Sequence, residues 1–346
     1  ERVHISSQDF TNQEEREEGY LCQTGFTYED YPQWSYLVCG VEIVRTMVLM
    51  QGANTVGISY EIRNHSDQEA VLEVYPHLQF VPKGALLSKE QAFTIEGARI
   101  SSNGRNLHVS TNGELQELPL TFHDNLYYAY DACDGRREVG CTAVNHCIVF
   151  RVSPRETKTL WMVYGICPGT KFEDILHNME EHRSSLRKRA GFENEAARTL
   201  TVSAYQFISY RASTANQTLL AGFPFFEDWG RDTMIALAGC CLVTKQYETA
   251  KSILQTFMTY CRKGLMPNLF PEGKEAPMYN TVDASLLFII AVYEYFNRTQ
   301  DKVLVKSAYQ TMMEIIDWYV KGTDFGIQME EDGLLRAGKD YDQVTW

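Results

Sequence analysis

The sequence is organised around the segment Pro224-Phe-Phe-Glu-Asp-Trp-Gly-Arg-Asp-Thr233, which is followed at once by the apolar run 234–243. The segment holds two phenylalanines, a tryptophan, an arginine and three carboxylates. The apolar run predicts a buried helix, and Asp232 or Thr233 would be a natural cap for its free N–H groups. Capping alone does not require the tryptophan and the arginine. Aromatic faces beside charged hydrogen-bonding groups are typical of a site that binds a sugar ring.

Length and composition indicate a folded protein of two domains. The chain has 346 residues, of which 44% are hydrophobic and 22% are charged, and this is enough for two cores of ordinary size. The net charge of −13 disfavours nucleic acid and anionic membranes as partners, because both require a basic face. The longest apolar run, 284–292, is too short to cross a bilayer. We therefore expect a cytoplasmic protein with a neutral ligand.

The nine cysteines form no C-x-x-C pair, so neither a disulfide framework nor a zinc knuckle is indicated. We expect them to be reduced and mostly buried. The eight histidines all lie at or before His182 without the spacing of metal ligands. Structural roles are the simpler interpretation for each of them.

Short runs rich in β-branched and aromatic residues fill the first half of the chain. Residues 41–47, 55–62 and 70–75 alternate, and turn signals at 51–54 and 64–67 separate them. Similar runs follow at 93–95, 107–110, 126–130, 147–152 and 159–164. The pattern predicts an antiparallel β-sandwich over residues 1–170.

Three tyrosines in this half, Tyr127, Tyr128 and Tyr130, could bind sugar. Packing on alternate faces of a strand explains them more simply.

A charged helix over residues 171–192 is predicted to link the two domains. Its basic end, 183–189, favours a solvated face near a helix C-terminus and not a nucleic-acid patch. The next predicted helix, 193–211, opens a helical domain that covers residues 193–346.

Two kinds of helix then alternate. Residues 234–243 and 284–296 are apolar on nearly every face, whereas 246–262 and 302–319 are apolar on one side. A helix that is apolar on every face must be surrounded by protein, while a one-sided helix can face water. This repeated pair predicts part of an α/α toroid. Both ends of the chain look cut, so we expect it to be part of a longer protein.

The loops before the inner helices carry aromatic and acidic residues. These loops are 225–233, 268–281 and 330–346. In a ring of helical hairpins, loops of the same phase open at the same end. We therefore expect the three loops to line one mouth, which is the candidate site.

No histidine lies between Phe223 and Trp346, which disfavours a Ser-His-Asp triad, a histidine-ligated metal and a histidine-based epimerase in this half. Two carboxyl groups that act as acid and base are the usual equipment for glycoside hydrolysis. Candidates at the mouth are Asp228, Asp232, Glu272, Glu275, Asp283, Asp340 and Asp342. Spacing alone does not identify the acid or the base among them.

Several of these segments resemble the amylo-α-1,6-glucosidase region of glycogen debranching enzymes of the bacterial and archaeal type. The matching residues are 225–237, 265–268, 279–286, 332–335 and Thr345-Trp346. The pieces D-W-G-R-D-T and Y-N-T-V-D-A together make the resemblance specific. It covers the chain from about Ile5 onward, and the first part is similar to the N-terminal β-sandwich of the family.

The resemblance implies an (α/α)6 barrel related to glucoamylases that hydrolyses α-1,6-linked glucose with inversion and without a cofactor. It implies that the substrate-binding residues are Asp228, Trp229, Arg231, Asp232, Asn280, Asp283 and Trp346. The general acid and base of the family would lie beyond Trp346. Glu227 departs from the pattern, because a small residue usually holds its place.

We therefore expect a glycoside hydrolase that removes α-1,6-linked glucose at the branch points of glycogen, limit dextrin or branched maltooligosaccharides. An inverting disaccharide phosphorylase is one alternative, since such enzymes also join a β-sandwich to a helical ring. A non-catalytic glucan-binding fragment is the other. We expect no metal, no nucleic acid and no membrane partner.

Overall fold

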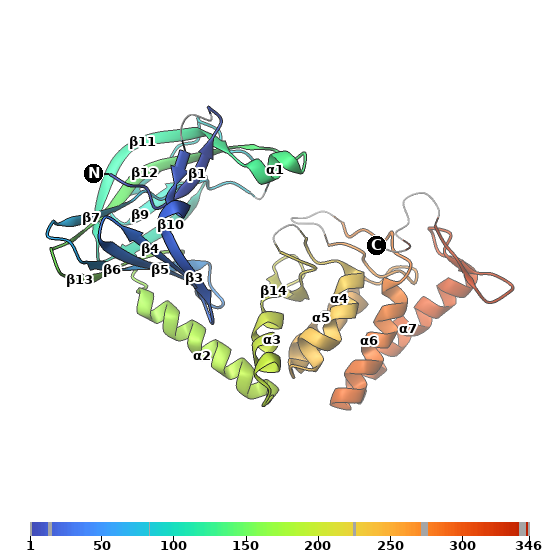
Figure 1. Ribbon diagram of the computed structural model, residues 1–346. Helices are drawn as coiled ribbons and strands as arrows, with labels where there is room; N and C mark the ends of the chain where they lie inside the picture. Colours follow the sequence, from blue (N-terminus) through green and yellow to red (C-terminus); the bar gives the residue numbers. More distant parts are fainter. Residues whose placement is uncertain are drawn as a thin grey trace. The chain divides into compact units, whose positions relative to one another are not determined.

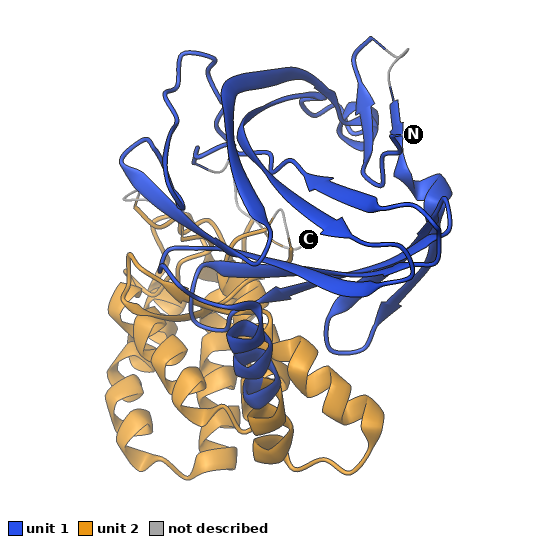
Figure 2. Cartoon of the chain, turned by 90° about the vertical axis from the view of Figure 1, so that its left-hand side faces the viewer, with its two compact units in different colours: residues 1–182 blue, residues 183–346 orange. Residues whose placement is uncertain are grey.

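The computed structural model describes residues 2–12, 16–82, 84–223, 226–270, 276–338 and 344. The chain divides into two compact units, Glu1–His182 and Arg183–Trp346, drawn in blue and orange in Figure 2. The boundary falls inside helix α2 (Phe172–Ala190). A large antiparallel β region is thus followed by helices, as the sequence predicts (Figure 1).

Unit 1 contains two antiparallel sheets. The larger one has the order β3 (Gln23–Tyr28), β4 (Pro32–Val38), β5 (Val41–Leu49), β6 (Thr55–Asn64), β13 (Thr157–Gly165), β10 (Arg105–Thr111), β9 (Arg99–Ser102) and β8 (Thr94–Glu96). The smaller one has the order β2 (Arg16–Glu18), β1 (Ser7–Phe10), β11 (Glu114–Tyr127), β12 (Val139–Val152) and β7 (Ala70–Val74). Two short helices, the 3-10 helix Gly19–Cys22 and α1 (Ala129–Cys133), and the first part of α2 also belong to this unit.

One hydrophobic cluster takes side chains from both sheets. Ile62 of β6 and Leu160 of β13 come from the larger sheet, and Ala143 and Ile148 of β12 come from the smaller one. Tyr60 and Ile62 of β6 are buried in this cluster, and Val56 and Ile58 pack against it, because every second side chain of a strand lies on the same face. The predicted alternation in residues 55–62 therefore corresponds to a real core face.

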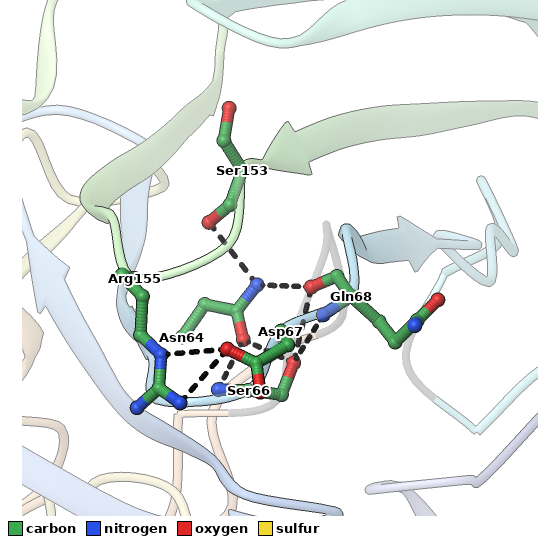
Figure 3. Close-up of polar contacts among 6 residues, drawn as sticks. All are labelled: Asn64, Ser66, Asp67, Gln68, Ser153 and Arg155. Carbon is green, nitrogen blue, oxygen red and sulfur yellow. Dashed lines mark hydrogen bonds and ion pairs between the residues drawn. The ribbon is translucent and has the colours of Figure 1, made fainter.

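Two turns that connect the sheets are joined by Asn64, which is 2% exposed. The chain passes from one sheet to the other after β6 and again after β12. Asn64 Nδ2 donates to the carbonyl of Gln68 (2.8 Å) in the first turn and to that of Ser153 (3.1 Å) in the second (Figure 3). Arg155 and Asp67 form a second, exposed link between the same turns.

The described part of unit 2 is built mainly from helices. They are α3 (Glu195–Tyr205), α4 (Gly230–Leu237), α5 (Tyr247–Tyr260), α6 (Ala284–Thr299) and α7 (Lys302–Lys321), with a π-helical turn at Ala238–Leu242 directly after α4. Two hairpins accompany them, β14 (Ile208–Arg211) with β15 (Asn216–Leu219) and β16 (Gln328–Met329) with β17 (Leu335–Arg336). Helix α6 contacts α4, α5 and α7 (Figure 1). Leu237, Phe257, Phe288 and Ile315, one from each of α4 to α7, share one core cluster.

Three sequence predictions differ from the structure. The predicted helix 193–211 ends at Tyr205, and Ile208–Arg211 pairs instead with Asn216–Leu219, because the β-branched and aromatic residues there suit a strand. Tyr130, predicted at the end of a strand, lies in α1. Of the nine cysteines, Cys147 and Cys241 are buried, three are exposed and four are intermediate, so most are not buried.

The two helices predicted to be surrounded on every side keep exposed apolar residues. Ile235 on α4 is 54% exposed and Ile290 on α6 is 55% exposed. The described residues do not cover that side of either helix. Within this part of the chain, no helix is both long and apolar enough to span a membrane.

Replacement of Asn64 by Ala should destabilise unit 1 by about 3 kcal/mol. The change leaves the carbonyl groups that Asn64 contacts without that donor, and each unpaired buried group costs about 1–3 kcal/mol. Native-state hydrogen exchange of the β6 and β13 amides measures the change. Asp67→Ala is the matched control, because it breaks only the exposed pair in the same turns and should cost under about 1 kcal/mol. Equal losses of stability in Asn64→Ala and Asp67→Ala would contradict the conclusion that Asn64 holds the two turns together.

Candidate sugar-binding site

A backbone hydrogen bond joins the first two of the three predicted mouth loops. Gly230 N donates to Asn268 O (2.8 Å), and within the second loop Met278 N donates to Leu269 O (3.0 Å). Trp229 pairs with Leu269 in an isolated antiparallel bridge, and Leu269 pairs with Met278 in another. Segments that are about forty residues apart in sequence therefore lie side by side at the start of α4.

Gly230 makes this close approach possible. A Cβ atom at this position would lie 2.0 Å from the carbonyl oxygen of Pro267, a distance that no side chain tolerates. Trp229, not Asp232 or Thr233, occupies the N-cap position, and it makes no side-chain cap bond. The predicted capping role is therefore wrong. Asp232 lies in the first turn of α4, and Thr233 is buried with its hydroxyl donating to Leu219 O (3.3 Å).

Arg231 and Asp283 form an ion pair between the starts of α4 and α6. Arg231 Nε donates to Asp283 Oδ2 at 2.6 Å, and the two side chains are 7% and 36% exposed. Thr281 Oγ1 donates to the other carboxylate oxygen at 3.0 Å. Asp283 holds the N-cap position of α6 without a side-chain cap bond, because its carboxylate is directed to these two partners.

The backbone before Asp283 is fixed by the outer helix α7. The hydroxyl group of the buried Tyr319 donates to Val282 O at 2.6 Å. On the other side, Ser285 Oγ accepts from Met266 N at 2.9 Å. The chain is therefore held in place on both sides of Asp283.

Asn280 lies beside the same loops. Its Oδ1 accepts from Nδ2 of Asn268 at 3.1 Å. Asn268 is 1% exposed and its carbonyl accepts from Gly230. Asn280 is thereby connected to the start of α4.

Asp228 is almost completely buried and has charged and polar partners. Its Oδ2 accepts from Arg211 Nε (2.7 Å) and Thr218 Oγ1 (2.6 Å), and Arg211 also contacts Oδ1. Arg211 lies over the ring of Phe270 at 5.2 Å. Sequence reasoning missed Arg211 and Thr218, because it placed residue 211 in a helix. Asp228 thus ties the β14–β15 hairpin to the candidate site.

Asp232 is partly buried, and burial raises the pKa of its carboxyl group. The nearby Arg231 acts in the opposite direction, whereas Asp283 adds to the rise in pKa. The ionised form is therefore held in an environment that disfavours it, which is common where a carboxylate has a functional task. Trp229 is partly exposed beside it.

Other predicted positions lie outside the described residues. These are Trp346, the carboxylates Glu272, Glu275, Asp340 and Asp342, and Phe225. Of the third loop, residues 330–338 and 344 are described, and they include β17 of a short hairpin. In the part of the chain that is described, no group of three or more His, Cys, Asp or Glu side chains could hold a metal ion.

The described cluster brings together an arginine, three carboxylates, an amide and an indole. Arg231, Asp283 and Asn280 are oriented by hydrogen bonds to their neighbours. Such an arrangement can orient several hydroxyl groups of a neutral ligand. It offers no thiol, imidazole or metal chemistry among the residues described.

Two family models match most of the chain. Residues 1–159 match the N-terminal region of glycogen debranching enzyme, and residues 202–346 match amylo-alpha-1,6-glucosidase. The chain is a glycogen-debranching-enzyme-like protein. Glycogen debranching enzyme of Saccharomyces cerevisiae is 33% identical over 108 residues, which cover 28% of this chain and 7% of the yeast enzyme. The match thus spans a small part of that relative.

One solved structure has a related fold. A protein described as a kojibiose phosphorylase from the human microbiome aligns with a TM-score of 0.53 at 10% identity, over 88% of this chain and 45% of that one. A bacterial glucoamylase in complex with acarbose aligns with a TM-score of 0.48 at 12% identity, over 87% of this chain and 50% of that one. This chain therefore spans about half the length of either structure.

Replacement of Asp228 by Ala should destabilise unit 2 by about 3–5 kcal/mol, the usual cost of removing one partner of a buried ion pair. Hydrogen exchange of the α4 and α5 amides measures the effect. Asp324→Ala is the control, since it breaks an exposed pair with Lys263 and should cost under about 1 kcal/mol. A loss no larger than that of the control would show that Asp228 does not hold the hairpin.

Replacement of Asp232 by Asn should stabilise unit 2 at neutral pH. Burial raises the folded-state pKa of Asp232 above its ordinary value of 3.8. The ionised carboxylate therefore opposes folding above the folded-state pKa, and the effect vanishes below pH 3.8, where both states are protonated. Melting temperatures of variant and wild type, compared from about pH 3 to about pH 7, measure it.

The control for this change is Asp317→Asn on α7, whose side chain is 59% exposed. The gain in melting temperature of Asp232→Asn over the wild type should grow as the pH rises through the folded-state pKa of Asp232. A gain in melting temperature that is the same at every pH would exclude titration of Asp232 as its cause.

Proposed function

We propose that the chain belongs to a glycoside hydrolase that removes α-1,6-linked glucose at the branch points of glycogen-like glucans. The observation that carries the proposal is the ion pair between Arg231 and Asp283, which joins the starts of two helices. Both residues lie in the segment that matches amylo-alpha-1,6-glucosidase. The pair, with Asp232 beside it, forms a polar surface suited to one terminal glucose.

The proposed role of Arg231 is to hold sugar hydroxyl groups. A guanidinium has five N–H donors in a fixed plane, and the carboxylate at Nε sets the orientation of that plane. Little reorganisation is then needed when a ligand arrives, which favours binding. Asp232 and Asn280 would supply acceptors and a donor, and Trp229 would cover an apolar face of the ring.

Asp228 is proposed to position a loop and not to bind the sugar. Since its carboxylate is occupied by Arg211 and Thr218, we assign it to positioning the loop that carries Trp229 and Arg231. The role of Trp346 stays a prediction. The inverting mechanism with two carboxylates also stays part of the proposal, and no residue of this chain is assigned as acid or base.

We propose the same architecture that the sequence predicts. It comprises a β-sandwich over residues 1–170, a linker helix over 171–192 and a partial (α/α)6 toroid over 193–346. The shared core of the two sheets and the helices α4 to α7 support it. A cytoplasmic location and catalysis without a cofactor belong to this proposal.

Glucose release by the complete protein tests the function. We expect glucose from a limit dextrin without added phosphate and none from linear maltoheptaose. Cleavage of the linear chain without release from the limit dextrin would contradict the proposal. A strict requirement for inorganic phosphate would favour the disaccharide phosphorylase, and binding without turnover would favour a glucan-binding protein.

Replacement of Arg231 by Ala should lower kcat/KM for glucose release by at least about 100-fold, because a charged donor fixed in the site is lost. Arg231→Lys should recover little of the lost kcat/KM, since an ammonium group lacks the planar set of donors. Calorimetry with glucose measures binding directly. Arg298→Ala, an exposed arginine on α6, is the control, and circular dichroism checks the fold. An unchanged affinity for glucose in Arg231→Ala would show that Arg231 is not part of the glucose site.

A further inference from the structure

A pocket in unit 2 lies where helix α2 ends and helix α3 begins. Its volume is about 390 Å³, which is within the usual range of small-molecule sites. It is lined by Ser184, Arg187, Lys188, Gly191, Phe192 and Arg198. Three of these six residues are basic and none is acidic, although the whole chain has a net charge of −13. The pocket is therefore a local exception to the acidic character of the protein.

The lining residues from α2 lie on one side of that helix. Ser184, Arg187, Lys188 and Gly191 have the spacing i, i+3, i+4 and i+7, and residues at this spacing are neighbours on a helix surface. Gly191 follows the last helical residue, and its N–H donates to Arg187 O at 3.1 Å, so it continues the last turn. The buried Leu186 lies on a different face. The basic face is thus separate from the face that enters the core.

Gly191 lets the chain turn directly into α3. Its φ angle is +73°, a left-handed conformation that glycine adopts readily at the end of a helix. Asn194 Oδ1 then caps α3 by accepting from Ala197 N at 3.1 Å. A Cβ atom at Gly191 would lie 3.3 Å from the ammonium nitrogen of Lys245. The exposed Lys245 therefore places a fourth cation next to the pocket.

Helix dipoles explain only part of this concentration of positive charge. The dipole of α2 favours cations in its last turn, which accounts for Arg187 and Lys188. Arg198 lies in the first turn of α3, where the dipole disfavours a cation. Its ion pair with Glu195 (3.5 Å) joins side chains that are 43% and 76% exposed, and such exposed pairs contribute little to stability. A bound anion would offset the repulsion among these cations.

The groups around the pocket suit a phosphate ester. Such a group carries nearly two negative charges at neutral pH and three acceptor oxygens. Arginine can donate two parallel hydrogen bonds to a phosphate, lysine adds a compact charge, and the hydroxyl group of Ser184 is a further donor. The volume of about 390 Å³ also leaves room for a ring attached to the phosphate.

The pocket lies at the opposite end of α4 from the candidate sugar site. Arg231 is in the first turn of α4, and the π-helical turn that continues α4 ends at Leu242. Helix α3 contacts this π-helical turn, and Arg189 of α2 donates to Gln246 just beyond it. At about 1.5 Å per residue, the helical path from Gly230 to Leu242 is roughly 20 Å long. A phosphate in this pocket is therefore separate from a sugar held at Arg231.

We propose that this pocket binds the phosphate group of a small organic phosphate. Lys188 and Arg198 hold the phosphate from two helices, and Arg187 and Ser184 lie on the same face of α2 as Lys188. The proposal does not depend on the proposed hydrolase function. Because a ligand that binds only the folded state stabilises it, the organic phosphate should also raise the melting temperature of unit 2.

Calorimetry of the complete protein tests the proposal with glucose 6-phosphate, AMP and inorganic phosphate as probes, at low ionic strength because salt screens such contacts. Lys188→Ala and Arg198→Ala should each weaken binding of the tightest probe roughly tenfold, since each removes a charged donor. Lys306→Ala on α7 and Arg298→Ala on α6 are the matched controls, because both residues are exposed and neither lines the pocket. Both controls should bind as the wild type does.

A conservative variant separates loss of the contact from loss of the fold. Lys188→Arg keeps the positive charge and should keep most of the phosphate affinity, and circular dichroism checks that each variant is folded. Binding of any of the three probes that falls in Lys188→Ala and Arg198→Ala supports the proposal, and the tightest probe identifies the source of the phosphate. The proposal would be overturned if the wild type bound none of the three, or if Lys188→Ala and Arg198→Ala bound them as Lys306→Ala does.

The Arg231→Ala variant distinguishes the phosphate pocket from the proposed hydrolase site. Phosphate binding should be unchanged in Arg231→Ala, and its loss there would place the phosphate at the sugar site and overturn the proposal. Intact phosphate binding by a protein that releases no glucose from limit dextrin would refute the hydrolase alone. Glucose release without binding of any phosphate probe would refute the phosphate pocket alone.

Discussion

The close contact between Gly230 and Pro267 is the constraint on which the rest of the candidate site depends. It removes the space for a side chain at Gly230 and brings the loop before α4 against the loop before α6. The hydrogen bond to Asn268 and the bridge from Trp229 to Leu269 follow from this approach. Arg231 then comes within reach of Asp283, which is 52 residues away in sequence.

The polar groups around this contact have two distinct roles. Asp228 is buried, and the partly buried Arg211 neutralises it, so this pair holds the geometry of the loop. Asp232 is left partly accessible in surroundings that favour its protonated form. A protein that retains an ionised carboxylate under such conditions gives up stability for another advantage, and a ligand whose hydroxyl groups donate to that carboxylate is a physical reason for it.

Much of the fold and part of the candidate site could be predicted from the sequence, because periodicity reports burial directly. The alternation in 55–62 and the apolar faces of 246–262 and 302–319 correspond to β6, α5 and α7. The meeting of the first two mouth loops followed from the repeat of helical pairs. The partners of Asp228 did not follow, because Phe207 and Ile208 also continue the apolar face of the preceding helix and so hid the strand Ile208–Arg211. The close contact between Gly230 and Pro267 could not be predicted either, since a glycine in the sequence does not indicate which segment packs against it.

A hydrogen bond from helix α7 supports the loop that carries Asp283. The hydroxyl group of Tyr319 on α7 holds the carbonyl of Val282, the residue directly before Asp283. Substitutions on the buried face of α7 could therefore shift Asp283 and change the proposed ligand preference of Arg231 and Asp283, without altering any group that is proposed to contact the ligand. Selection experiments that randomise only first-contact positions would overlook this route.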